Sequence, residues 1–191
     1  LNFESGASRS VRVRTTDSQG DNYEKALLIT VVQQSGAPTD ITLDSYDADE
    51  NQAHGTVVGS LSSTDIDPTD THTYALVMGI GDTDNASFQI AGGVLQTSAT
   101  LDFEAGTPLA IRVRTTDPQG LVYDKAFEIT VNDLNDVPTD IALDNNAIDE
   151  VIGGNQLVGN LASTDQDVAD THAYFLVDTA FYPDNVFFVV V

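Results

Sequence analysis

Residues 109–117 read Leu109-Ala110-Ile111-Arg112-Val113-Arg114-Thr115-Thr116-Asp117. The apolar side chains of Leu109, Ile111 and Val113 occupy every second position, so they would share one face of a strand. Residues 127–131 alternate in the same way. A two-residue period in both segments predicts half-buried β-strands.

Shorter strand-like segments lie between turn signals such as Gly92-Gly93 and Pro118-Gln119-Gly120. We expect these strands at 56–61, 72–77, 87–90 and 94–97, and a further strand at the apolar ending 186–191. No segment shows the 3.6-residue period of a helix. About seven short strands in about 100 residues is typical of an immunoglobulin-like, Greek-key β-sandwich. The predicted fold class is therefore all-β.

The chain repeats itself. The motif Arg12-Val13-Arg14-Thr15-Thr16-Asp17 returns at 112–117, and Pro38-Thr39-Asp40-Ile41 returns at 138–141. The spacing is about 100 residues, which is roughly one sandwich domain. We expect the end of one repeat, a complete repeat and the start of a third, in a linear array, at 1–37, 38–137 and 138–191.

The composition is strongly acidic, with 30 Asp and Glu against 7 Lys and Arg and a formal net charge of -23. This charge argues against nucleic acid and against an anionic membrane surface, because both are bound through Lys and Arg. The apolar ending is far shorter than the ~20 residues that span a bilayer, so we expect no membrane insertion. The absence of cysteine excludes disulfides, thiol nucleophiles and cysteine-bound zinc.

The acidic residues gather in short motifs at predicted strand ends. Two Asp-x-Asp pairs lie at Asp65-Ile66-Asp67 and Asp165-Gln166-Asp167, and Asp133-Leu134-Asn135-Asp136 lies between two repeats. Calcium takes six to eight oxygen ligands, and an Asp-x-Asp pair supplies two carboxylates from one turn. These motifs therefore favour Ca²⁺ sites.

The order of the motifs resembles that of cadherin repeats, particularly those of large bacterial surface proteins and adhesins. The motifs run in the order Glu50-Asn51, Asp65-Ile66-Asp67, Leu101-Asp102-Phe103-Glu104, Thr115-Thr116-Asp117-Pro118-Gln119-Gly120 and Asp133-Leu134-Asn135-Asp136-Val137-Pro138. The resemblance covers the whole chain. It implies an extracellular, cell-surface location and calcium bound between successive domains, with ligands from both domains and from the linker.

The resemblance also implies which residues bind calcium. We call the boundary between 1–37 and 38–137 the first junction and the boundary between 38–137 and 138–191 the second junction. At the second junction the implied ligands are Glu50, Asp102, Glu104, Asp133, Asn135, Asp136, Asp165, Asp167 and Asp170. At the first junction they are Glu4, Asp65, Asp67 and Asp117. The second linker departs from the family pattern, because Val137 follows Asp136 where a second Asn is expected. The first linker, 32–38, has no carboxylate. Fewer anionic oxygens bind calcium more weakly, so we expect a loaded, stiff second junction and a partly loaded or empty first one.

The function predicted from these features is mechanical: a calcium-rigidified spacer or adhesive segment whose partners are calcium, neighbouring repeats or copies of itself, and a cell-surface protein or glycan. An enzyme is not expected, because no nucleophile elbow or phosphate-binding loop is present. His72 and His172 are expected at strand edges, because imidazole is a poor calcium ligand.

Two alternatives remain open. One is a carbohydrate-binding module, for which Tyr23 and Tyr123 are the candidate contacts, although the chain has no Trp. The other is a self-assembling filament, in which segments 1–37 and 138–191 of different copies pair and together make one complete sandwich.

Overall fold

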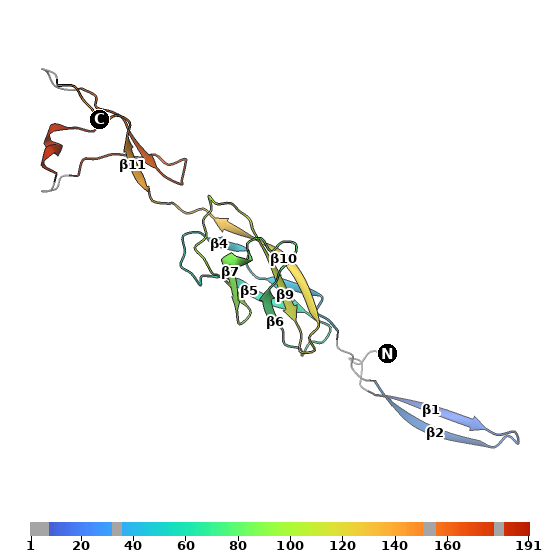
Figure 1. Cartoon of the computed structure of the whole chain (residues 1–191). Coiled ribbons are helices and arrows are strands. Elements are labelled where there is room, and N and C mark those ends of the chain that lie inside the picture. The colour runs from blue at the N-terminus through green and yellow to red at the C-terminus, as the bar shows by residue number, and fades with distance from the viewer. Residues whose placement is uncertain (1–7, 32–35, 151–155, 178–181) are drawn as a thin grey trace.

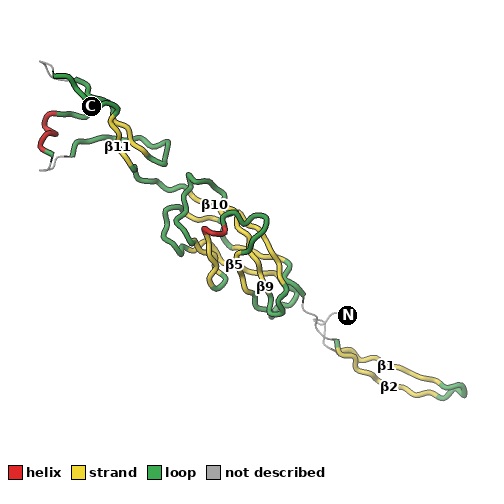
Figure 2. The backbone as a smooth tube through the Cα atoms, viewed as in Figure 1, coloured by secondary structure: helices red, strands yellow, loops and turns green. Residues whose placement is uncertain are grey.

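The computed structural model describes residues 8–31, 36–150, 156–177 and 182–191. Figure 1 shows an isolated hairpin, a sandwich and a more open segment, one after another along the chain. Figure 2 shows that strands and loops make up nearly all of the described backbone. Its helices are short 3₁₀ turns, at Asn85–Ser87 and Pro183–Phe187. No helix in the described ranges is long and apolar enough to cross a bilayer.

Two four-stranded sheets form the central sandwich. The order in one sheet is β3-β5-β8-β7, and all neighbours are antiparallel. Its strands are β3 (Asp40–Leu43), β5 (Val57–Thr64), β7 (Phe88–Ala91) and β8 (Val94–Thr97). The order in the other sheet is β4-β10-β9-β6. Its strands are β4 (Asp47–Asp49), β6 (Thr73–Leu76), β9 (Leu109–Thr116) and β10 (Val122–Asn132).

The chain changes sheets between β3 and β4, and β4 then pairs in parallel with β10. This crossing places residues 49 and 50 beside the end of β10, where the amide of Glu50 donates to the carbonyl of Asn132. The segment that follows β4 and the linker that follows β10 therefore lie at the same end of the sandwich.

The inward faces of the two sheets form one hydrophobic core. Ile41 and Leu95 from one sheet and Ile111 and Ile129 from the other are fully buried. Burying side chains of this size is the main favourable term in folding. The alternation predicted in the two long strands is confirmed. Lys125 also links the sheets, because its Nζ donates to Asp40 Oδ1 and to the Ile41 carbonyl, each at 2.7 Å.

The hairpin of β1 (Ser8–Thr16) and β2 (Asn22–Thr30) has the same register as β9 and β10. Val13 lies opposite Lys25 as Val113 lies opposite Lys125. The surroundings differ, because the second sheet is missing there. Val13 is 50 % exposed, whereas Val113 is buried.

The strands β11 (Asp140–Leu143) and β12 (Leu161–Thr164) repeat β3 and β5 in the same register. Their apolar side chains are again open: Ile141 is 63 % exposed, whereas Ile41 is buried. In the described residues, each terminal part thus has one strand pair of the central repeat, with its apolar side chains exposed.

The strand expected at 186–191 is not present. Residues 183–187 form a 3₁₀ helix, and residues 188–191 have no regular structure. The equivalent residues 88–91 form β7, which is held only by β8 (Val94–Thr97). In the described part of the chain, no strand pairs with residues 188–191. A strand without a partner loses its backbone hydrogen bonds, so none forms.

Candidate metal centres

The side chain of Glu50 lies at the second junction, between the Leu101–Glu104 motif and the linker. It follows β4 and is fully buried. Its Oε2 accepts the amide hydrogen of Phe103, and its Oε1 accepts that of Leu134, each at 2.7 Å. Glu50 thereby joins the Leu101–Glu104 motif and the linker to the end of β4. Buried charge is costly unless it is hydrogen-bonded, and these two amides supply that compensation.

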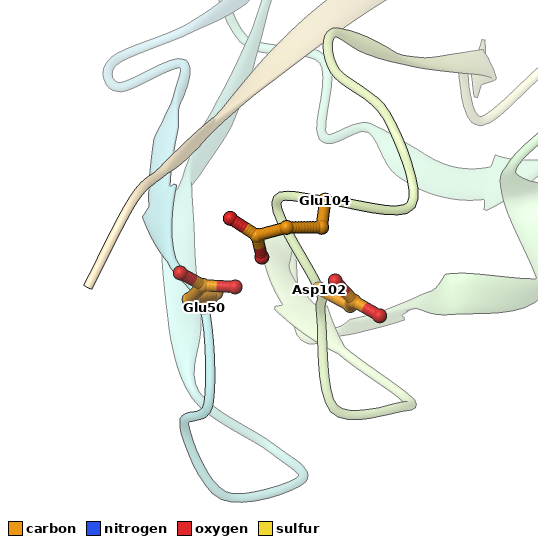
Figure 3. Close-up of side chains that lie close together, drawn as sticks. All are labelled: Glu50, Asp102 and Glu104. Carbon is orange, nitrogen blue, oxygen red and sulfur yellow. The ribbon is translucent and has the colours of Figure 1, made fainter. Parts of the chain in front are cut away.

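Two overlapping groups of carboxylates surround Glu50. Glu50, Asp102 and Glu104 each place an oxygen within 4.8 Å of the other two. Figure 3 shows the Glu104 side chain reaching from its loop toward Glu50, with Asp102 below it. Glu104, Asp133 and Asp167 form the second group, again within 4.8 Å. This second group combines the central repeat, the linker and the following segment.

Crowding changes the acidity of two members of these groups. Desolvation raises the pKa of Glu104, and the negative charges of Glu50, Asp133 and Asp136 raise it further. The pKa of Asp133 is raised first by desolvation and then by the charges of Asp167, Glu50 and other neighbours. Like charges held this close favour the neutral acid unless a cation lies between them.

Hydrogen bonds also cross the second junction. The Asp136 amide donates to Asp167 Oδ2 at 2.5 Å, and Gln166 Nε2 donates to Asp102 Oδ1 at 3.3 Å. Asn51 Nδ2 donates to Asp136 Oδ1 at 2.7 Å. These contacts connect the linker with the repeats on both sides of it.

A third group lies at the other end of the central sandwich. Asp65, Asp70 and Asp117 each place an oxygen within 4.8 Å of the other two. Asp117 is buried, and its Oδ1 accepts the amides of Gln119 and Leu121 at 2.9 and 2.7 Å. This turn fixes the carboxylate at the end of β9.

Two oxygens of the third group are orphaned. Within the described part of the chain, Oδ2 of Asp70 and Oδ2 of Asp117 are buried without a hydrogen-bond partner. The pKa of Asp70 is raised by desolvation and then by the charges of Asp67, Asp65 and Asp117. Unpaired buried oxygens in a native fold call for an explanation, and a bound hard cation provides one. The donor set, which contains oxygen only, fits calcium.

The structure thus brings together seven of the residues expected from the sequence, in three groups: Glu50, Asp102, Glu104, Asp133 and Asp167 at one end, Asp65 and Asp117 at the other. Asp67 lies beside the latter and accepts the Gly36 amide at 2.8 Å. Asp136 and Asn135 lie in the linker, where Asn135 Nδ2 donates to the Asp136 carbonyl. Glu4 lies outside the described residues.

Asp70 was not expected at the first junction, although it belongs to the third group. The repeat could have indicated it, because Asp70 stands where Asp170 stands in the next repeat, and Asp170 was expected as a ligand. Asp165 and Asp170 lie in the loop that also holds Asp167. Asp165 contacts His172, and the Asp170 amide donates to the Asp167 carbonyl at 2.9 Å.

The two tyrosines considered for glycan contact have different surroundings. Tyr23 is 66 % exposed on the hairpin, whereas Tyr123 packs against the central core. Of these two rings, only Tyr23 is open to solvent.

Solved structures with a similar architecture include cadherin ectodomains. Cadherin domains 1–5 of protocadherin gamma B2 match 88 % of this chain with a TM-score of 0.62 at 18 % identity, over 34 % of that chain. PcdhgB3 EC1-4 matches 88 % with a TM-score of 0.61 at 20 % identity, over 43 % of its own length. The human desmocollin-1 ectodomain matches 90 % with a TM-score of 0.51 at 23 % identity, over 34 % of its length.

This similarity shows that the chain has the fold of tandem cadherin-like β-sandwich repeats. Neither a protein-family model nor the sequence of a curated protein matches it. The chain spans less than half of the length of these ectodomains.

Proposed function

We propose that this chain is a calcium-binding, non-enzymatic segment of an extracellular array of cadherin-like repeats. Ions at the junctions would hold consecutive repeats in a fixed orientation. One observation carries the proposal: Glu104, Asp133 and Asp167 come from a repeat, a linker and the following segment, and their oxygens converge within 4.8 Å. A divalent ion bound there would join all three parts of the chain.

The proposed ligands at the second junction are Glu50, Asp102, Glu104, Asp133 and Asp167, with Asn135, Asp136, Asp165 and Asp170 completing the set. The ion would supply the positive charge that these carboxylates lack. This chain's own residues hold them in place: the amides of Phe103 and Leu134 fix Glu50, and the Asp136 amide fixes Asp167.

The two junctions differ in what an ion would connect. At the first, Asp65, Asp70 and Asp117 all belong to the central repeat, and the linker 32–38 has no carboxylate. An ion bound there would stabilise the end of the sandwich without the same hold on the preceding hairpin. We therefore expect the second junction to be stiff and the first to bend.

The wider role follows from these sites. We propose that segments 1–37, 38–137 and 138–191 belong to three consecutive repeats of a spacer or adhesive rod, on a bacterial cell surface as the motif order suggests. Its contacts would be neighbouring repeats, copies of itself, and a surface protein or glycan.

Calcium titration of matched variants tests the proposal. Asp117→Asn removes one charge but keeps Oδ1, which accepts two backbone amides. We expect about tenfold or more weaker binding at one class of site, because charge count tunes calcium affinity. Asp133→Asn should weaken the other class. The measurement is isothermal titration calorimetry of the full chain with calcium chloride.

Asp17→Asn is the matched control. Asp17 has the same turn, since its Oδ1 accepts the amides of Gln19 and Asp21 at 3.0 and 2.9 Å, but it belongs to none of the three carboxylate groups. It should leave the titration unchanged. An absence of binding heat at millimolar calcium, or an equal loss with Asp17→Asn, would show the proposal to be wrong.

A further inference from the structure

Each Asp-x-Asp pair is in contact with a histidine. His72 Nε2 lies 2.9 Å from Asp65 Oδ2, and His172 Nε2 lies 2.8 Å from Asp165 Oδ2. The side chains of His72 and Asp65 are only 10 % and 3 % exposed, and those of His172 and Asp165 are 20 % and 5 % exposed. The same contact occurs at the same position of two repeats.

In each pair the histidine donates the hydrogen bond and the carboxylate accepts it. An ionised carboxylate only accepts hydrogen bonds, so Nε2–H of His72 donates to Asp65. The other oxygen, Oδ1, accepts the amide of Asp67 at 3.0 Å. Both oxygens of Asp65 are therefore held, and the carboxylate plane cannot rotate freely. In the next repeat, Asp165 Oδ1 accepts the Asp167 amide at 3.2 Å in the same way.

The held carboxylate belongs to a candidate cation site. Asp65 lies in one group with Asp70 and Asp117, and the latter two have the orphaned oxygens. Imidazole nitrogen is a poor ligand for a hard cation such as calcium. The ring therefore contributes through the carboxylate that it contacts.

We infer that His72 and His172 are positioning residues, which hold the first Asp of each Asp-x-Asp pair in the orientation that binds the cation. The inference rests on the proposed function. It also changes the role expected from the sequence. His72 does precede a strand, since β6 begins at Thr73, whereas the described residues after His172 form none, and in both cases the ring contacts a proposed ligand.

A simpler role has to be separated from this one. The contact also closes the loop 65–72, so that loss of the histidine could lower stability without affecting calcium. Stability measured in chelator and in calcium distinguishes the two roles. Loop closure affects both conditions equally, whereas positioning of a ligand affects the gain that calcium brings.

The experiment uses the full chain with His72→Leu, His72→Gln and the same two changes at His172. Leu removes the donor, and the Nε2 of Gln reaches about as far as that of His. Each Leu variant should bind calcium chloride about tenfold or more weakly at its own site, because partners that orient ligands typically contribute 10- to 100-fold. Each Gln variant should recover most of that affinity. His54→Leu, at an exposed position, is the control and should change nothing.

Calorimetry gives the affinities, and thermal melting in calcium and in chelator gives the calcium-dependent shift in melting temperature. A smaller shift with Leu, restored by Gln, supports the inference. Equal affinity in wild type and the Leu variants, with melting lowered equally in both conditions, overturns it and leaves the proposed function standing. If wild type gives no binding heat, the proposed function fails and the inference fails with it. If the His172→Leu variant does not fold, His172→Asn takes its place. The Asn side chain is too short to reach Asp165, and it is smaller than the histidine ring.

Discussion

Asp124 and Asp133 have opposite electrostatic surroundings. Asp124 accepts hydrogen bonds from Arg114 Nε at 2.7 Å and Arg112 Nη2 at 3.3 Å, and this pairing holds its pKa below the usual value. Asp133 has acidic neighbours, and its pKa is raised. With 7 basic residues for 30 acidic ones, most carboxylates cannot have a protein cation as partner. The carboxylates at the ends of the sandwich that have no basic partner are therefore the ones whose charge an external cation would neutralise.

The pH dependence of stability without calcium follows from these shifts. Asp70, Glu104 and Asp133 have raised pKa values, above the ordinary 3.8, 4.5 and 3.8. As pH falls from about 7 toward about 5, the folded chain takes up protons at these groups before the unfolded chain does. The free energy of unfolding in chelator should therefore rise over this range. Urea denaturation at a series of pH values measures it.

Below the ordinary carboxyl pKa the trend should reverse. Asp40, Asp65, Asp124 and Asp144 have lowered pKa values, so their contribution to stability is lost as pH falls through the folded-state values. In calcium, the free energy of unfolding should instead fall as pH falls from about 7 toward about 5, because protons compete with the ion for the same carboxylate oxygens. Identical profiles in calcium and chelator would contradict both assignments.

Strands with nearly the same pattern differ in how much they are buried. Ile129 on β10 is fully buried, whereas Ile29 on β2, at the equivalent position, is 45 % exposed. The difference arises because β9 and β10 face a second sheet and the hairpin of β1 and β2 does not. A hairpin without such a face is marginally stable in water.

The two isoleucines form a matched pair for mutation. Ile129→Ala should lower the free energy of unfolding of the central sandwich by about 2–5 kcal/mol, because it leaves a cavity in a packed core. Ile29→Ala should change it by less than about 0.5 kcal/mol, as surface substitutions do. Chemical denaturation of the full chain measures both.

An effect of Ile29→Ala as large as that of Ile129→Ala would mean that the hairpin is packed in solution. Because its apolar face is open within one chain, the packing partner would then be another copy. That outcome would favour the self-assembling alternative over an isolated hairpin.

The molecule as a whole is a series of units linked at their ends. Figure 1 shows the hairpin, the sandwich and the following segment in succession. In such an arrangement shape depends on two short linkers. The second has carboxylates from both sides and hydrogen bonds across it, whereas the first linker has no acidic residue.

Small-angle X-ray scattering should detect the difference. We expect a narrow distribution of interatomic distances in calcium and a broader one in chelator, because repulsion among Glu104, Asp133 and Asp167 would loosen the second junction. Asp133→Asn in calcium should resemble the chelated wild type. Superimposable curves with and without chelator would contradict a calcium-stiffened junction.

The sequence by itself determined the all-β fold, the long strands and the 100-residue spacing of the motifs. These properties are local: a two-residue alternation makes the apolar face of β9, and a repeated motif such as Arg112-Val113-Arg114 repeats its structure wherever it occurs. The acidic motifs could likewise be located from the sequence, because each consists of a few neighbouring residues.

Only the tertiary structure decided which of these residues meet. Asp65, Asp70 and Asp117 come from a loop and a distant strand end, and the pairing of β6 with β9 brings those segments together. The contacts of His72 with Asp65 and of Glu50 with the Leu134 amide likewise depend on folding. Residues 188–191 have the composition of a strand but no partner strand. A strand or an ion site is completed by groups far away in the chain, and only the packed fold specifies which groups those are.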